Sequence, residues 1–258
     1  MRSHTPRAQQ GGFTIVEIMV AMLIGLFLLG GLLTLVQDNR RTFASQNQLS
    51  QLQDAERVAM TMITDVIQTA GYFPDPTSNS ATTALTAAGA MVAGQSLVGT
   101  YNAAAPGDTL TVRFATTTGD GVLNCLGQSN TTGNVAPLMY TNVFSVANGQ
   151  LLCGLNGAAA IALAGTTPVS LTNPALNNGI VINKLTVLYG INAAGVDQSV
   201  TEYVNASGVT VWSNVISIRV TLEFLNPLWS QAAQTAGSTV PQYIDFQRVI
   251  GVMNQTGI

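Results

Sequence analysis

An apolar run near the N-terminus constrains this chain more than any other feature. It extends from Phe13 to Val36 and holds one charged residue, Glu17. As a helix rising 1.5 Å per residue it would span about 36 Å, enough to cross a hydrocarbon core of roughly 30 Å. A secretory signal peptide has a shorter apolar core, followed by its cleavage site. Here the candidate site, Gly11-Gly12, precedes the run, so cleavage would leave the helix as the new N-terminus.

The residues around this site resemble the precursor of a type IV pilin or pseudopilin. The hexapeptide Gly12-Phe13-Thr14-Ile15-Val16-Glu17 follows a short basic leader and opens the apolar run. The resemblance implies that a prepilin peptidase cuts after Gly12 and methylates the new N-terminal Phe13. It also implies that Glu17, five residues into the mature chain, acts in filament assembly.

The charge of Glu17 supports a specific role independently of the resemblance. A carboxylate in a membrane helix costs about 2.5–3.5 kcal/mol on insertion scales, so it needs a partner or a function. One interpretation makes Glu17 the counter-ion of the free amine of Phe13 on a neighbouring subunit. The other makes it a carboxylate near the helix end that reaches the head-group region and stabilises the helix N-terminus. The matching cleavage site favours the first interpretation.

The charge balance argues against nucleic acid as a partner. Nine Lys and Arg stand against 12 Asp and Glu, and removal of the leader with Arg2 and Arg7 leaves seven against 12, a net charge of −5. Such a chain has no basic field to attract a polyanion. Arg2 and Arg7 precede the apolar run and place the N-terminus on the cytoplasmic side. Arg40 and Arg41, which follow the run, oppose this only weakly, because large domains translocate largely regardless of charge.

We therefore expect a single-pass protein of the bacterial inner membrane with its C-terminal domain in the periplasm. The assembled surface pilus is a second expected location. The surface of the domain must be covered mainly by neutral polar side chains, because only 8% of the residues are charged.

After Val36 the helical pattern becomes amphipathic without any helix breaker. Small and aliphatic residues recur at steps of three and four, which predicts a face packed on a globular domain: Leu49, Leu52, Ala55, Ala59, Ile63, Val66 and Ala70. Gly71 is suited to end the helix, and Pro74 and Pro76 prevent its continuation. The expected domains are a leader over 1–12, a helix over 13–70, transmembrane at 13–36 and amphipathic at 37–70, and a periplasmic β-rich domain over 71–258.

Two adjacent glycines, Gly30 and Gly31, interrupt the apolar run. Each costs about 1 kcal/mol relative to alanine in a helix interior. They would permit close helix–helix packing, for which membranes favour small residues. By resemblance to assembled pilins, they could instead mark a segment that loosens inside the filament. The sequence does not decide between the two.

The rest of the chain predicts a mainly antiparallel β domain, which makes the fold α+β and pilin-like. Segments 74–106 and 154–178 are rich in small residues and are expected to be connections. Alternating residues predict strands around Leu110–Phe114, in a hairpin of Val143–Val146 and Gln150–Cys153 on an Asn148-Gly149 turn, and at Ile180–Ile191, Val209–Leu225 and Tyr243–Met253. Trp212 would lie in a strand and belong to the core.

Short segments of this domain resemble PilW-type minor pilins in particular, and they occur in the same order. They are the helix exit Ala70-Gly71-Tyr72, the hairpin Asn148–Cys153, Tyr189–Asn192 and Trp212–Val220. The resemblance implies other minor pilins, the major pilin and the prepilin peptidase as partners. In such proteins the loop after the Tyr-Gly element is often rich in aspartate. Here it offers Asn192, Asp197 and Glu202, too few carboxylates for a calcium site, so we expect no metal.

The chemistry-bearing residues predict neither an enzyme nor a cofactor. Cys125 and Cys153 are the two cysteines, and an isolated pair in an exported domain most often forms a disulfide. The one histidine, His4, lies in the leader, so the mature chain can build neither a zinc site with histidine ligands nor a Ser-His-Asp or Cys-His constellation. The scattered carboxylates Asp108, Asp120 and Glu223 are expected to be solvated surface.

Three functions are consistent with these patterns. The preferred one is a minor pilin that contributes to the initiation of a type IV pilus, with a place near the tip as one option. A minor pseudopilin of a type II secretion system would share the same N-terminal logic. A pilus-borne adhesin would instead bind a surface ligand through its β domain, and exposed aromatic residues including Trp212 or Trp229 would favour it.

Overall fold

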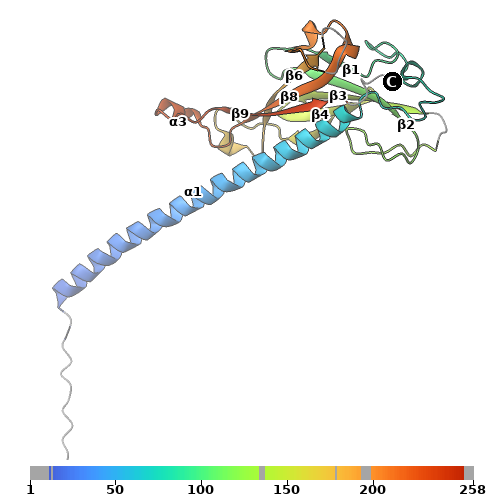
Figure 1. Ribbon diagram of the computed structural model, residues 1–258. Coiled ribbons are helices and arrows are strands. Elements are labelled where there is room, and N and C mark those ends of the chain that lie inside the picture. Colours follow the sequence, from blue (N-terminus) through green and yellow to red (C-terminus); the bar gives the residue numbers. More distant parts are fainter. Residues whose placement is uncertain (1–11, 13, 134–136, 178, 193–198, 253–258) are drawn as a thin grey trace, which may run out of the picture. The chain divides into compact units, whose positions relative to one another are not determined.

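The structure is a computed structural model, and it describes residues 12, 14–133, 137–177, 179–192 and 199–252. The chain forms two compact units, Met1–Asn47 and Gln48–Ile258. Helix α1 begins in the first unit and ends in the second, and every strand of the described residues lies in the second unit (Figure 1).

Helix α1 runs from Ile15 to Gln68, a length of 54 residues, which confirms the long N-terminal helix predicted by the apolar and amphipathic patterns. The chain leaves the helix through Gly71, whose φ of 77° is in the left-handed region that favours glycine. The Gly71 N–H donates to the Arg113 carbonyl at 2.9 Å, so the exit of the helix is tied to the β domain.

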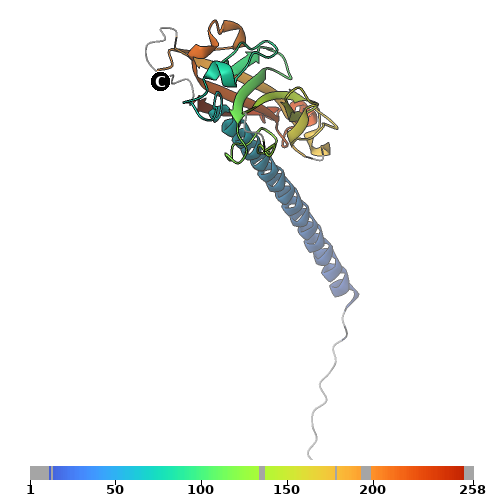
Figure 2. The same ribbon diagram turned by 90° about the vertical axis from the view of Figure 1, so that its right-hand side faces the viewer.

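The part of α1 that belongs to the second unit buries an apolar stripe. Its buried residues are Leu52, Ala59, Met60, Ile63, Val66 and Ile67, and Ala70 just beyond the helix is buried too. The predicted stripe is thus confirmed at its centre, while Leu49 and Ala55 are half-buried. The last turns of α1, coloured cyan, lie against the strands in both views (Figures 1 and 2).

The first sheet has five antiparallel strands in the order β1-β2-β3-β4-β5. Their bounds are Leu97–Thr100, Thr109–Thr116, Leu138–Ala147, Gln150–Leu155 and Ile161–Gly165. The β3–β4 hairpin is the one predicted from its turn. Asn148 and Gly149 have φ values of 50° and 76°, the positive angles that a tight two-residue hairpin turn needs.

The second sheet has four antiparallel strands in the order β7-β6-β8-β9. Their bounds are Glu202–Val204 for β7, Ile182–Ile191 for β6, Val215–Leu225 for β8 and Tyr243–Gly251 for β9. Strand β8 alternates as expected, because Val220, Leu222 and Phe224 are fully buried while Thr221 and Glu223 are half-buried.

One hydrophobic core joins the two sheets and the buried stripe of α1. Backbone bonds also tie β6 to the first sheet and its loops. The Ile182 N–H donates to the Gly149 carbonyl at 2.9 Å, and the Leu185 N–H donates to the Pro106 carbonyl at 3.1 Å.

The structure corrects the sequence analysis in three places. Segments 74–106 and 154–178 are not only connections, because β1 lies in the first and β5 in the second. The predicted strand Val209–Leu225 begins only at Val215. Strand β5 is a short edge strand without polar residues, so it has no polar–apolar alternation to detect. Residues Trp212–Asn214 form the 3-10 turn η3, so Trp212 is half-buried beside the sheet instead of inside a strand.

The remaining elements are short. They are helices α2, Ala81–Ala84, and α3, Gln231–Thr235, and 3-10 turns η1, Pro174–Leu176, and η2, Ala206–Gly208. Strands β1 and β7, of four and three residues, were not predicted either, because strands of this length carry no usable period.

Candidate processing and assembly site

Gly12, the described residue of the predicted cleavage site, is accessible. Gly12 is exposed, and a Cβ built on it would meet no atom within 4 Å. Packing within the described residues therefore gives no reason for glycine at this position. A glycine here is consistent with an external protein that must approach the backbone closely. Phe13, the predicted methylation site, lies outside the described residues.

Thr14 caps the first turn of α1, a role that the sequence analysis missed. The Glu17 N–H donates to the Thr14 hydroxyl at 3.3 Å and to the Thr14 carbonyl at 3.1 Å. A threonine followed three residues later by glutamate is the pattern of a capping box, so the signal was present in the sequence. Glu17 is thus an exposed carboxylate in the first turn of the helix, where the helix dipole favours negative charge.

The apolar half of α1 has no packing partner among the described residues of the first unit. From Ile15 to Val36 every residue is exposed except Gly25, which is half-buried, and large side chains such as Phe27 are up to 81% exposed. By length and composition this helix is suited to cross a membrane. So large an apolar surface requires lipid or other helices around it.

The adjacent glycines leave the helix intact. Helix α1 is continuous through Gly30 and Gly31, and a Cβ at either position would meet nothing within 4 Å. Nothing in the described part of the chain therefore requires glycine there. Close packing against a neighbouring membrane helix would give small residues a role at these two positions.

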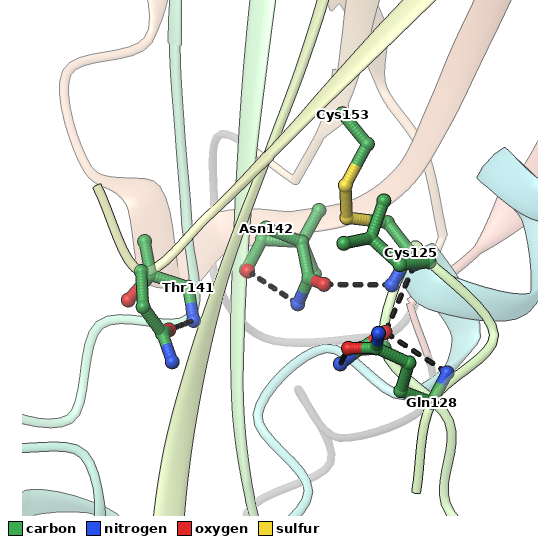
Figure 3. The surroundings of a disulfide bond; sticks show 9 residues. Cys125, Gln128, Thr141, Asn142 and Cys153 are labelled. Atoms are coloured by element: carbon green, nitrogen blue, oxygen red, sulfur yellow. Dashed lines mark hydrogen bonds between the residues drawn. A yellow bond between two sulfur atoms is a disulfide. The ribbon is translucent and has the colours of Figure 1, made fainter. Parts of the chain in front are cut away.

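The two cysteines form a disulfide that closes a loop on the first sheet (Figure 3). Cys153 lies on β4, and Cys125 lies in the segment between β2 and β3, with 6.2 Å between their Cα atoms. A bridge across 28 residues contributes up to roughly 3–4 kcal/mol in the chain-entropy model.

A buried asparagine on β3 holds the disulfide loop from inside. The Asn142 side-chain oxygen accepts the Cys125 N–H at 2.9 Å, and its amide nitrogen donates to the Val112 carbonyl at 3.3 Å (Figure 3). Asn142 is fully buried, so these bonds satisfy groups that water cannot reach. The sequence analysis missed this residue, because the predicted strand began only at Val143. The signal was present, since Asn142 alternates in step with the buried Phe144 and Val146.

The carboxylates considered for chemistry are not brought together. The expectation of solvated surface is wrong for Asp108, because its carboxylate is buried and accepts the N–H groups of Asn102 and Val187, at 2.8 Å and 2.7 Å. Asp120 closes a local turn, and Glu223 accepts a bond from the Asn183 amide. No group of three metal-ligating side chains occurs among the residues that the structure describes. Asp197, considered for calcium, lies outside them.

Comparison with known proteins identifies the N-terminal segment. The prokaryotic N-terminal methylation motif matches residues 7–33, which cover Gly12, Glu17 and the apolar run except its last three residues. The chain carries the type IV pilin signal. This pilin-like N-terminus implies processing by a prepilin peptidase, anchoring in a membrane and assembly with other pilins. The match to PilW-type minor pilins in particular stays a prediction.

The other comparisons add little. A solved structure of a type IV-like pilin from Thermus thermophilus is similar at 12% identity, covering 79% of this chain and 96% of that chain. Its TM-score is 0.41, a likeness too weak to carry an argument. A search among curated proteins found no match.

Proposed function

We propose that this chain is a minor pilin that contributes to the initiation of a type IV pilus. One observation carries the proposal: the methylation motif, residues 7–33, continues into a helix whose apolar residues are unburied from Ile15 to Val36. A helix of this kind is suited first to a bilayer and then to a bundle of like helices. The short PilW-like segments of the β domain support a minor role over that of the major subunit.

In this proposal each part of the chain has one task. Residues 1–12 are the leader that the prepilin peptidase removes, and Phe13 becomes the methylated N-terminus. Residues 13–36 hold the subunit in the inner membrane, residues 37–70 carry the amphipathic half of the helix, and 71–258 form the periplasmic domain. Glu17 pairs with the Phe13 amine of a neighbouring subunit, either a minor pilin or the major pilin. The disulfide between Cys125 and Cys153 suits the oxidising periplasm.

Deletion of the gene in its own bacterium tests the proposal. We expect several-fold fewer surface pili by electron microscopy, restored by the wild-type gene, and unchanged export of a type II secretion substrate. Pili depend on the subunit here because initiation needs every member of the starting complex. Normal pili with lost secretion would instead identify a pseudopilin, and no change in either would contradict both roles.

A further inference from the structure

A groove in the β domain lies between three loops close to the exit of α1. It has a volume of about 860 Å³. Its walls come from segments 71–82, 92–96 and 210–213, which include the turn that carries Trp212. A volume of this size falls within the range of small-molecule sites, roughly 300–1,000 Å³.

The residues of this groove share an unusual chemistry, because none of those described is charged. Two aromatic side chains line it, Phe73 and Trp212, and both are half-buried. The polar lining residues are neutral hydroxyl and amide side chains: Asn79, Ser80, Thr82, Gln95, Ser96, Thr210 and Ser213. Aromatic faces beside hydroxyls and amides suit a ligand that has apolar C–H faces and many uncharged hydroxyl groups.

One wall of the groove is held in place from behind by a buried arginine. Arg113 on β2 is fully buried, and its guanidinium donates to the carbonyls of Thr86, Val92 and Gln95 at 2.5–3.1 Å. The guanidinium therefore faces the backbone of segment 92–96, and this segment also lines the groove. A wall fixed in this way loses little conformational entropy when a ligand binds.

The part of the groove formed by segment 210–213 is held by aromatic packing of Trp212. Trp212 packs edge-to-face against the buried Tyr189, with 4.9 Å between the ring centroids and 84° between the planes. Trp212 therefore packs against the hydrophobic core and also lines the groove. A rigid, half-buried indole is a low-entropy contact surface for a ligand.

We propose that this groove binds a neutral saccharide. Sugar rings would pack on Trp212 and Phe73, and their hydroxyls would exchange hydrogen bonds with the neutral side chains around them. The absence of a lining cation in the described groove disfavours acidic sugars, which would bury an unpaired charge. The site goes beyond the role in pilus assembly and does not depend on it, since every residue used lies in the second unit.

Binding of the processed full-length chain, held in lipid nanodiscs, to an array of neutral and acidic oligosaccharides tests this site. Nanodiscs avoid glycoside detergents, whose head groups would compete. We expect binding to neutral oligosaccharides, weakened about tenfold by Trp212→Ala, because a central aromatic contact is lost. Ser213→Arg should abolish binding, because it places a long cationic side chain at an exposed position in the groove.

Ser207→Arg is the matched control. It adds the same side chain at an exposed position of η2, outside the groove, and should leave binding unchanged. Ser213→Arg also keeps the test decisive if Trp212→Ala does not fold. The proposal is overturned if no neutral oligosaccharide on the array binds, if only acidic ones bind, or if binding survives Ser213→Arg. Loss of pili in Ser213→Arg without any saccharide binding would identify the groove as a subunit contact and would also overturn it.

Discussion

Glu17→Gln should lower the recovery of this subunit with its pilin partners about tenfold, while the β domain stays folded. Tenfold corresponds to about 1.4 kcal/mol, less than the roughly 2.5–3.5 kcal/mol that an unpaired carboxylate costs in a membrane helix. Pairing with an amine on a neighbouring helix offsets part of that cost and also fixes the axial stagger of the two helices. Apolar side chains alone specify such a stagger poorly.

Glu17→Gln should remove the charge without disturbing the N-terminal cap of α1. Glutamine serves at the third position of a capping box as glutamate does, so the bond between the Glu17 N–H and the Thr14 hydroxyl should persist. Crosslinking of wild type and Glu17→Gln at matched expression measures the effect. Asp54→Asn removes the same charge from an exposed position further along α1 and should change little. Equal recovery of Glu17→Gln and wild type would contradict a role in assembly and leave Glu17 only the role of stabilising the helix N-terminus.

Arg113→Met should destabilise the β domain by about 3–5 kcal/mol. Methionine keeps an apolar stem of similar length but leaves the carbonyls of Thr86, Val92 and Gln95 without their donors. A carbonyl that is shielded from water costs about 1–3 kcal/mol when it loses its donor, and water can recover part of this cost at Thr86 and Val92, which are exposed residues. Arg113 has no carboxylate partner among the described ion pairs, and burial lowers the pKa of its guanidinium. The carbonyls are thus what compensates its charge.

Denaturant unfolding of the full-length chain in nanodiscs, followed by near-UV circular dichroism, measures this loss. Arg57→Gln is the control, because the Arg57 side chain is 76% exposed and its one ion pair, with Asp54 at 3.5 Å, lies on the surface. It should shift the free energy of unfolding by less than about 0.5 kcal/mol. A shift within 1 kcal/mol of wild type for Arg113→Met would mean that segment 86–95 does not depend on the guanidinium.

The features that the sequence predicted are those with a strong local period or a specific turn. Helix α1 has an unbroken helical pattern, β8 alternates along its whole length, and the Asn148-Gly149 turn requires positive φ angles. Each of these signals acts within a few residues, so no tertiary information was needed. The cysteine pair was readable for a different reason, because two cysteines allow only one pairing.

The burial of Arg113 could not be predicted from the sequence, because it is caused by a distant segment that covers the strand. Because side chains alternate along β2, Arg113 lies on the face of the strand that does not carry Leu110 and Phe114. From the sequence, that second face would be taken as solvated. The structure buries Arg113, because segment 86–96 covers that face of β2. The position of Trp212 was missed because Val209 and Val211 precede the 3-10 turn and extended the apparent strand pattern across it.

Mass spectrometry of the N-terminus of the protein purified from membranes tests the central claim most directly. In a strain with a working prepilin peptidase, we expect the chain to begin at a methylated Phe13, because Gly12 presents an open backbone within the methylation motif. Gly12→Val in the same strain should retain the leader, because a branched side chain blocks close approach to the backbone. A wild-type chain that still begins at Met1 or Arg2 would contradict the account.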